Sequence, residues 1–354
     1  MKTIVLTGGG TAGHIMPNLA LLPLIKKNFS KIYYLGSKDS MEEKIIKEQT
    51  DIEFIPIPAV KLVRKFTFKN FLIPFKLING ILQTKKILKK IKPDAIFCKG
   101  GFVSVPVAIA GKKCKIPVIS HESDLSMGLA NKIILRYAST MCTTFEDTAK
   151  TSNRCICTGS PIRDQIFNGN KHNVLKNFTN YNPHLPFVLF FGGSLGSVKI
   201  NKIVEDNIDK LLNNYNIIHI LGKKNSNNIN KKGYFKQNFV SNIEDYFALA
   251  DIVVCRGGAN SLFELLALNK PMLIIPLSKA ESRGDQIENA EYFKRHKFAE
   301  VLREENLTPS ALLSKLDYIQ RNNEQIIANM QKNNLANSNQ KIVDIIKEHC
   351  NFTW

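Results

Sequence analysis

The chain has 354 residues, of which 44% are hydrophobic, and it carries a formal net charge of +19 at pH 7. This length allows about two domains with cores of their own, and the apolar fraction is that of a globular protein. No apolar run approaches the roughly 18 residues that cross a bilayer, while a balance this basic indicates nucleic acid, an anionic membrane surface or a polyanionic substrate as partner.

The first twenty residues hold the most informative pattern of the chain. A short apolar run over Lys2–Thr7 predicts a buried parallel strand, and four glycines with His14 lead from it into an apolar-periodic helix. A strand, a glycine turn and a helix start bring backbone N–H groups to one point, which attracts phosphate. The spacing also satisfies the dinucleotide fingerprint, but the second strand (31–35) ends in Gly36-Ser37 without the acid that the fingerprint requires.

The next residues alternate strands and helices as a doubly wound sheet does, with strands at 31–35 and 53–57 and a helix at 41–48. Residues 61–92 break this rhythm, because they hold ten Lys or Arg and no acid, interleaved with apolar side chains. One interpretation is a solvated basic face on two core helices. The other is insertion into an anionic lipid interface through apolar residues flanked by lysines: Phe66, Phe68, Phe71, Leu72 and Phe75 with Lys65, Lys69 and Lys76.

A second glycine turn follows the strand 93–98 and opens another helix, and polar residues 121–124 follow the strand 116–120. Polar residues at the carboxyl ends of parallel strands lie where open α/β sheets bind ligands, so we expect a site there. The run 165–184 is polar and is expected to be a linker.

The opening pattern then repeats, with a strand at 186–191, a glycine turn at 192–197 and one helix over 200–212. A strand is expected at 251–255, followed by a glycine pair that opens a helix with Glu264 near its first turn. That carboxylate either complements the helix dipole or accepts both hydroxyls of a ribose. The other expectations are a mobile loop (225–237), a strand (271–277), a polar loop (278–289), helices beyond it, and a tail (342–354) that packs on the first half.

Seven motifs occur in order across nearly the whole chain: TGGGTAGHIMPNLA, KGGFVSVP, SHESD, GSPIR, FGGSLGS, CRGGANSLFELL and GDQIENA. Together they resemble the MurG family of peptidoglycan-precursor glycosyltransferases. The resemblance implies an α/β protein of the GT-B fold, with two Rossmann-like doubly wound domains facing a cleft. We expect an acceptor and membrane-facing domain at 1–163, joined by helix 342–354, and a UDP-GlcNAc-binding domain at 164–341.

The resemblance also implies roles for individual residues of the donor site. Ser194 and Arg163 would contact the pyrophosphate, Val240 the uracil, and Glu264 the ribose hydroxyls. The remaining donor-site positions would be Ala259 and Ser261 at the helix start, and Gln286, Asp285 and Asn289 near the sugar.

The N-terminal turns would receive the lipid pyrophosphate, with His14 and Glu122 on the catalytic side. The acceptor-binding positions would be Gly10, Thr11, Ala12, Gly13, Gly100, Gly101, Ser104 and Asp124. Three positions depart from the family pattern, since Leu195 and Asp285 replace a usual Gln and Asp124 a usual Asn. Leu195 removes a possible polar contact, and the two acids add negative charge near anionic substrates.

The implied activity is an inverting transfer of GlcNAc from UDP-GlcNAc to the C4 hydroxyl of MurNAc in undecaprenyl-pyrophosphoryl-MurNAc-pentapeptide (lipid I), which forms lipid II. His14 is the candidate base, because the unperturbed pKa of imidazole lies near working pH; the alternative is that His14 only hydrogen-bonds phosphate or caps the helix. We expect no metal or other cofactor, since no Asp-x-Asp pair and no Cys/His ligand spacing occurs. The expected location is peripheral, on the cytoplasmic face of the inner membrane, with other cell-wall synthesis proteins as possible partners.

Two interpretations from other classes stay open at this point. One is a two-domain NAD-linked oxidoreductase, which the missing acid after the second strand disfavours. The other is a basic nucleic-acid-binding protein. We do not expect a nucleic-acid partner, because the basic residues cluster with Phe and Leu rather than along a groove.

Overall fold

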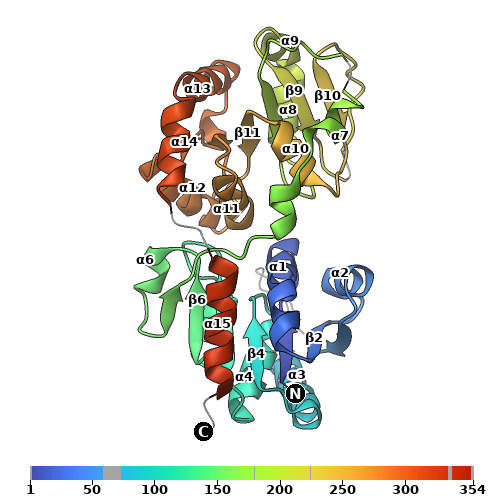
Figure 1. The fold of residues 1–354 in the computed structure, drawn as a ribbon, viewed down its shortest axis with the longest axis vertical. Coiled ribbons are helices and arrows are strands. Elements are labelled where there is room, and N and C mark those ends of the chain that lie inside the picture. The colour runs from blue at the N-terminus through green and yellow to red at the C-terminus, as the bar shows by residue number, and fades with distance from the viewer. Residues whose placement is uncertain (1, 59–72, 179, 224, 334–336, 352–354) are drawn as a thin grey trace. The chain divides into compact units, whose positions relative to one another are not determined.

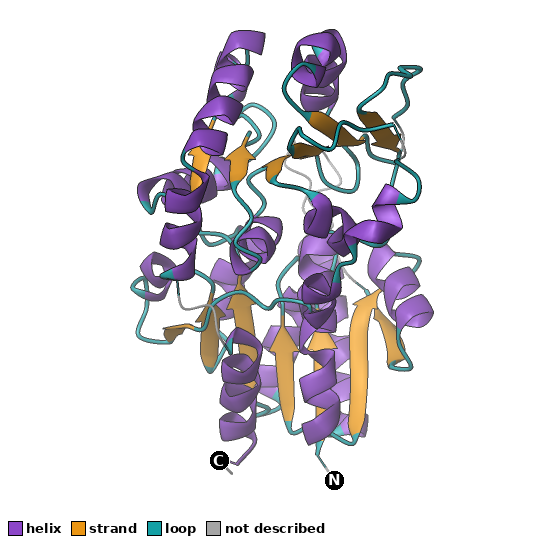
Figure 2. Cartoon of the chain, turned by 45° about the horizontal axis from the view of Figure 1, so that its top comes forward, coloured by secondary structure: helices purple, strands orange, loops and turns teal. Residues whose placement is uncertain are grey.

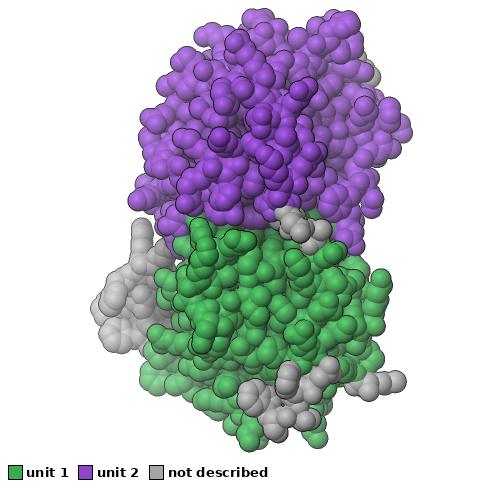
Figure 3. Space-filling model, turned by 60° about the vertical axis from the view of Figure 1, so that its left-hand side comes forward, with its two compact units in different colours: residues 1–163, 335–354 green, residues 164–334 purple. Residues whose placement is uncertain are grey.

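The computed structural model describes residues 2–58, 73–178, 180–223, 225–333 and 337–351, and it divides into two compact units. The first unit comprises residues 1–163 and 335–354, and the second comprises residues 164–334; Figure 3 shows them in green and purple. We had expected the chain to return to the first unit at 342, whereas the unit boundary lies earlier, before helix α15 (Ser338–Asn351). The reason is that the whole helix belongs to the first core, with Ser338 already buried at its start.

The first unit is a seven-stranded parallel sheet in the order β3-β2-β1-β4-β5-β6-β7 (Figure 1). Its elements are β1 (Thr3–Thr7), α1 (Ala12–Asn28), β2 (Lys31–Ser37), α2 (Met41–Gln49), β3 (Glu53–Ile57), α3 (Ile73–Ile91), β4 (Ala95–Cys98), α4 (Ser104–Lys113), β5 (Val118–Glu122), α5 (Leu129–Leu135), β6 (Thr140–Thr143), α6 (Glu146–Ala149), β7 (Cys155–Cys157) and α15.

Helices cover both faces of this sheet, which is why its central strands are apolar throughout. All five residues of β1 are buried, and their side chains alternate between two hydrophobic clusters. Ile4 and Leu6 pack with α1 and α15, while Val5 packs on the other face with α3 and α4. Helix α15 contributes Ile342, Val343 and Ile346 to the first cluster, and Figure 1 shows it beside α1. The expected packing of the C-terminal tail on the first half is therefore confirmed for the described part of that tail.

The second unit is a six-stranded parallel sheet in the order β10-β9-β8-β11-β12-β13 (Figure 2 shows the strands in orange). Its elements are η2 (Asp164–Asn168), α7 (Lys171–Leu175), β8 (Phe187–Phe191), α8 (Val198–Asp206), α9 (Ile208–Leu212), β9 (Asn216–Ile220), β10 (Tyr234–Gln237), α10 (Ile243–Leu249), β11 (Ile252–Cys255), α11 (Ala259–Ala267), β12 (Met272–Ile274), α12 (Asp285–Arg295), β13 (Ala299–Val301), η3 (Glu304–Asn306), α13 (Pro309–Arg321) and α14 (Asn323–Gln331).

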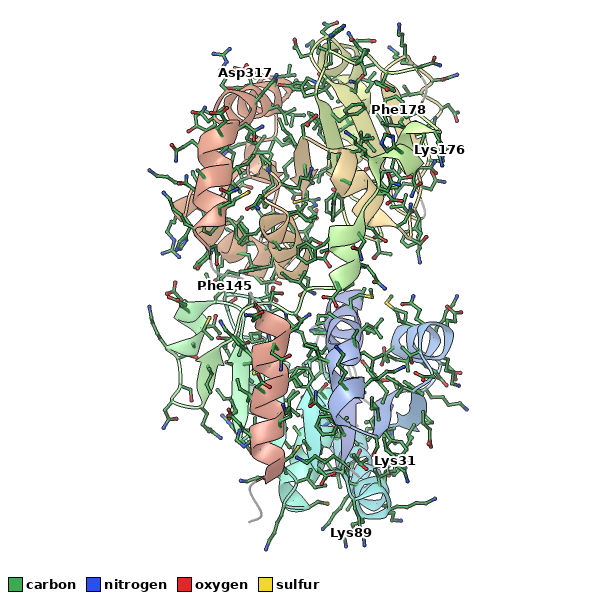
Figure 4. The ribbon with its side chains drawn as sticks, in the orientation of Figure 1. Lys31, Lys89, Phe145, Lys176, Phe178 and Asp317 are labelled. Atoms are coloured by element: carbon green, nitrogen blue, oxygen red, sulfur yellow. The ribbon has the colours of Figure 1, made fainter. Side chains whose placement is uncertain are left out.

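The expected linker at 165–184 was wrong, since it contains η2 and α7. The side chain of Asn170 caps α7 by accepting from the backbone N–H of His172 at 3.0 Å. Phe178, labelled in Figure 4, is 3% exposed and stacks on Phe235 of β10 with ring centroids 5.4 Å apart. These buried contacts make the segment part of the second unit's core.

Two short strands of the second unit were also missed. The expected loop at 225–237 ends in β10, which pairs with β9 through Tyr234 and Ile217. The expected all-helical C-terminal part contains β13, which pairs with β12 through Ala299 and Met272. In addition, the single helix expected over 200–212 is two helices, because the backbone leaves the helical region at Asn207 (φ −126°, ψ 19°). Both missed strands are edge strands of only three or four residues, which leave little periodic signal.

Among the described residues, no helix combines the length and the apolarity that crossing a bilayer requires. Helix α3 instead presents lysines to solvent, including Lys89, which Figure 4 labels. Of the membrane-facing residues expected from the sequence, Phe75 and Lys76 are described, and both are exposed, Phe75 at 72%. Phe66, Phe68, Phe71 and Leu72, with Lys65 and Lys69, lie outside the described residues.

Candidate active site

The two glycine turns of the first unit lie against each other at the carboxyl edge of its sheet. They follow β1 and β4, which are neighbours with Thr7 opposite Cys98. A Cβ on Gly101 would lie 2.3 Å from the carbonyl oxygen of Gly9, and Gly101 has φ +79°. Only glycine fits there without displacing the facing turn. The predicted acceptor positions Gly10–Gly13 and Gly100–Gly101 are thus brought together.

His14 is held by the first glycine turn at its Nδ1 atom. Nδ1 lies 3.0 Å from the carbonyl oxygen of Gly9 and 3.1 Å from Oγ1 of Thr11. Because a carbonyl oxygen only accepts, the neutral ring carries its hydrogen on Nδ1. Nε2 is then the basic nitrogen, which is the arrangement that a general base requires.

Helix α1 begins beside these contacts with its positive end unneutralised by its own residues. Thr11 is the N-cap but makes no capping hydrogen bond through its side chain, and the first turn contains no acidic residue. The backbone N–H groups of Ala12 and Gly13 belong to this first turn. They form the type of helix start that attracts phosphate.

Glu42 of α2 supports the first glycine turn, and the sequence analysis did not single it out. Its carboxylate is 2% exposed and accepts hydrogen bonds from the backbone N–H groups of Gly10 and Ser37, both at 3.2 Å. A Cβ on Gly9 would lie 2.5 Å from this carboxylate. From the sequence, Glu42 resembles any acid in the first turn of a helix, so no local signal marks it.

Glu122 is buried at the end of β5, and its carboxylate holds the following loop. It accepts from the backbone N–H of Asp124 (3.0 Å) and of Gly128 (3.0 Å), and from Nδ2 of Asn131 (2.9 Å). The residue is 4% exposed. This geometry favours a positioning role over the catalytic one expected from the sequence. His121 and Glu122 also belong to β5 itself, whereas we had expected the strand to end at 120.

Lys99 is a buried cation beside Glu122, and it was not among the predicted site residues although it begins the KGGF motif. It is 1% exposed and its Nζ donates to Oγ of Ser123 at 2.6 Å. Burial lowers the pKa of Lys99 to about 8, against the opposing charges of Glu122 and Asp124. Burial and the nearby Lys99 also hold the pKa of His121 well below its usual range, so His121 is neutral and its Nε2 donates to the carbonyl of Gly159 at 3.0 Å.

Ser104 is used within its own turn. Its Oγ donates to the carbonyl of Gly100 at 2.8 Å, and the residue is fully buried. The structure therefore gives this predicted acceptor-binding residue the task of fixing the second glycine turn.

In the second unit, the loops after three neighbouring strands meet at one edge. β8 and β11 are neighbours with Phe191 opposite Cys255, and Nη2 of Arg256 donates to Oγ of Ser197 at 2.5 Å across the two glycine turns. Oε1 of Gln286 accepts from the backbone N–H groups of Gly257 (3.2 Å) and Leu277 (3.1 Å), which joins the loops after β11 and β12. Ser194, Ala259, Ser261 and Gln286 thus lie at the same edge of this sheet.

Glu264 lies half-buried in α11 and outside its first turn, which contains no acidic residue. We had placed it near the first turn, where dipole complementarity would explain it. That explanation does not hold at this position. Gly258 is the N-cap of α11 and has no side chain with which to cap the helix.

Asn289 does not face outward as expected for a sugar contact. It is fully buried, and its Nδ2 donates to the carbonyl of Gly257 at 3.0 Å. Asp285 begins α12 and lies 3.5 Å from Nη2 of Arg283. This ion pair offsets the extra negative charge that Asp285 brings to the site.

The other residues predicted for the donor site are exposed or half-buried. Ser194 and Leu195 are exposed in the glycine turn, Leu195 at 71%. Val240 is half-buried before α10. Arg163 is half-buried and is the last residue of the first unit before the chain enters the second.

Comparison with known proteins identifies both units with a glycosyltransferase family. Residues 4–143 match the glycosyltransferase family 28 N-terminal domain, and residues 187–348 match the family 28 C-terminal domain. The chain is 47% identical over 354 residues to a Clostridium botulinum (strain Langeland) protein, with 99% of each chain covered, and 45% identical over 353 residues to a Clostridium tetani protein, with 98% of each covered. Both carry the name UDP-N-acetylglucosamine–N-acetylmuramyl-(pentapeptide) pyrophosphoryl-undecaprenol N-acetylglucosamine transferase.

The fold is also that of a solved glycosyltransferase. The crystal structure of Acinetobacter baumannii MurG superposes with a TM-score of 0.76 at 23% identity, covering 98% of this chain and 100% of that one. The expectation of a GT-B fold is confirmed by this similarity. The comparisons give no support to an oxidoreductase or a nucleic-acid-binding protein.

Proposed function

Because the chain belongs to the MurG enzymes of glycosyltransferase family 28, we propose that it transfers GlcNAc from UDP-GlcNAc to the C4 hydroxyl of MurNAc in lipid I. The product is lipid II, the disaccharide precursor of peptidoglycan. The observation that carries this proposal is the pair of parallel sheets, each with glycine turns at its carboxyl edge, in a chain that matches its named relatives over nearly its whole length.

The second unit is proposed to bind UDP-GlcNAc. The start of α11 brings backbone N–H groups to this edge behind Gly258, which has no side chain, and Ser194 is exposed in the glycine turn after the neighbouring strand β8. A half-buried carboxylate outside the first turn, such as Glu264, suits the two hydroxyls of a ribose as a bidentate acceptor. These are the features that a nucleotide diphosphate requires.

The first unit is proposed to bind the pyrophosphate of lipid I. The start of α1 has no acid in its first turn, and the paired turns at Gly9 and Gly101 bring backbone of two loops together. Lys99 adds positive charge at the same edge, because it begins the second turn and its buried Nζ donates to Oγ of Ser123 in the loop after the neighbouring strand β5. Acceptor specificity then rests on backbone N–H groups and one buried cation.

The reaction is a single displacement with inversion at the anomeric carbon. As the C4 oxygen attacks and bonds to C1 of GlcNAc, its proton passes to Nε2 of His14, and the bond from C1 to the UDP oxygen breaks. The Nδ1 contact with Gly9 supports this role by fixing the tautomer. The charge that develops on UDP is stabilised by the α11 start and by Arg163, so that no metal is required by this mechanism.

Helix α3 is proposed to contact an anionic membrane surface from the cytoplasmic side. Phe75, Ile78 and Leu82 are 72%, 54% and 55% exposed, and their spacing places them on one face of the helix. Exposed lysines on the same helix suit anionic headgroups: Lys76, Lys86, Lys89 and Lys90. This arrangement supports peripheral attachment near the lipid-linked acceptor, where other cell-wall synthesis proteins also act.

The test is a transfer assay with radiolabelled UDP-GlcNAc and a lipid I analogue. The proposal requires release of UDP together with a β-linked GlcNAc–MurNAc disaccharide. Release of free GlcNAc without a lipid-linked disaccharide, at saturating acceptor, would mean that lipid I is not the substrate.

A further inference from the structure

The carboxyl edge of the second unit is held by one buried carboxylate, that of Glu304 at the start of η3. Its side chain is 1% exposed, and two cations reach it from other elements. Oε1 lies 2.6 Å from Nη1 of Arg256, and Oε2 accepts from Nζ of Lys199 at 2.7 Å. Oε2 also lies 3.4 Å from the backbone N–H of Ser278.

These contacts join the segments that follow four adjacent strands of the sheet. Lys199 belongs to α8 after β8, Arg256 follows β11, Ser278 follows β12, and Glu304 follows β13. The glycine turns that carry Ser194 and Ala259 are therefore tied to a single group.

Arg256 connects Glu304 to the glycine turn after β8, which contains Ser194 and Ser197. Its side chain is 11% exposed, its Nη1 donates to the carbonyl of Ile275 at 3.1 Å, and its Nη2 donates to Oγ of Ser197. Ser197 in turn caps α8, since its Oγ accepts from the backbone N–H of Ile200 at 3.2 Å. A guanidinium held at three points fixes the spacing between the turns after β8 and β11.

Glu304 is ionised in this setting. Burial opposes the charge, but the contacts from Lys199 and Arg256 outweigh it and hold the pKa of Glu304 below its usual range. Removing one member of such a buried group leaves an uncompensated charge, which costs more than a surface pair would. Neutralising Glu304 would thus release Arg256 from its orientation.

We infer that Glu304 is a positioning residue for the diphosphate of the nucleotide sugar, acting through Arg256 and Lys199 on the two glycine turns. The inference rests on the proposed function, which assigns the donor to this unit. Glu304 does not touch the donor in this account. It sets the distance between the backbone groups that do.

The experiment compares Glu304→Gln with Glu305→Gln in the full-length chain. Glu305 is the next residue, its side chain is 56% exposed, and it lies 4.0 Å from Nη1 of Arg303. We measure the affinity for UDP by calorimetry, and then kcat and KM for both substrates. Glu304→Gln should weaken UDP binding and raise the donor KM on the order of tenfold, with kcat at saturating donor and the acceptor KM nearly unchanged. Glu305→Gln should behave as the unaltered chain.

Two further variants separate the possible failures. Lys199→Met keeps Arg256 in place and should weaken UDP binding less than Glu304→Gln, with exposed Lys202→Met as its control; it also tests the inference if Glu304→Gln does not fold. Glu264→Ala reports on the donor site itself. If Glu264→Ala loses UDP affinity while Glu304→Gln and Lys199→Met keep it, the inference is wrong and the proposed function stands. If all three keep it, the donor does not bind in this unit.

Discussion

The two carboxyl edges share one backbone pattern and differ in how buried charge supports it. In the first unit, Glu42 and Glu122 accept mainly from backbone N–H groups, at 2.9–3.2 Å including one amide side chain. In the second unit, Glu304 is neutralised by Arg256 and Lys199. The strand–glycine–helix pattern thus sets the backbone of the turns. The electrostatic environment of each turn depends on acids outside this pattern, namely Glu42 and Glu122 in the first unit and Glu304 in the second.

This difference matters because the two proposed substrates are both anionic. A carboxylate that accepts hydrogen bonds from backbone N–H groups, as Glu42 does from Gly10, leaves fewer of these groups for a ligand. A carboxylate that pairs mainly with side-chain cations, as Glu304 does with Arg256 and Lys199, occupies fewer backbone N–H groups of its turns. The second edge is therefore suited to a tightly held diphosphate, and the first to a phosphate approached from the helix start with a base beside it.

Of the changes considered, His14→Ala in the first unit should lower activity the most. Loss of the base should lower kcat by about 10²–10⁴-fold while UDP affinity stays unchanged, because His14 lies in the first unit. Initial rates at saturating substrates and UDP calorimetry measure the two quantities. A variant with normal turnover would remove His14 from the mechanism.

Glu264→Ala in the second unit should weaken donor binding, whereas His14→Ala should lower kcat. Loss of a charged acceptor to a ribose is worth about 1.5–3 kcal/mol, so the donor KM should rise by about 10–100-fold with the acceptor KM unchanged. Glu288→Ala, at an exposed position of α12, is the control. An unaltered donor KM would exclude the ribose contact.

Lys99→Met tests the buried cation of the first edge through the pH dependence of stability. The pKa of Lys99 is lowered from 10.5 to about 8, so between these values the folded chain binds fewer protons than the unfolded chain. Stability from this group therefore rises with pH through that window, by about 3 kcal/mol at most. The free energy of unfolding in urea, measured from pH 7 to 10, should rise with pH in the unaltered chain and in the control Lys113→Met, whose position is exposed. Lys99→Met should lack this part of the rise. Parallel profiles for all three would contradict a buried, charged Lys99.

Phe75→Asp with Ile78→Asp tests the exposed face of α3. Each apolar side chain that enters the interface contributes about 1.5–3 kcal/mol, so sedimentation with anionic liposomes should fall by at least about tenfold. The fold should persist, since both side chains are exposed. The matched control is Phe167→Asp with Tyr318→Asp, two exposed aromatic positions of the second unit. Equal liposome binding by the two double variants would place the membrane contact elsewhere.

Chelation has the smallest expected effect. Because Arg163 and helix starts are proposed to stabilise the leaving UDP, excess EDTA should leave the initial rate unchanged. A rate that EDTA abolishes and Mg²⁺ or Mn²⁺ restores would replace this part of the mechanism.

The sequence predicted most of the framework, because its signals are local. The buried strands and the glycine turns at Gly8–Gly13 and Gly192–Gly196 follow from short apolar runs and glycine spacing. The edge strands β10 and β13 were missed because each has only three or four residues, which leave little periodic signal. Only the folded sheet makes such residues strands.

The site was predicted less completely, because several of its residues depend on contacts with other elements. The first glycine turn and His14 can be identified from one sequence motif. The roles of Glu42, Lys99 and Glu304 depend instead on contacts with residues of other elements. Asn289 shows the reverse case. Its amide looked suited to a sugar, yet its place in α12 directs it to the carbonyl of Gly257 in the core.

Hydrogen exchange with and without UDP shows whether the second edge holds the nucleotide and the first does not. We expect slower amide exchange at residues 192–197 and 257–264 when UDP is bound, with exchange at residues 8–13 unchanged. Protection confined to residues 8–13, with the other two segments unaffected, would contradict this assignment.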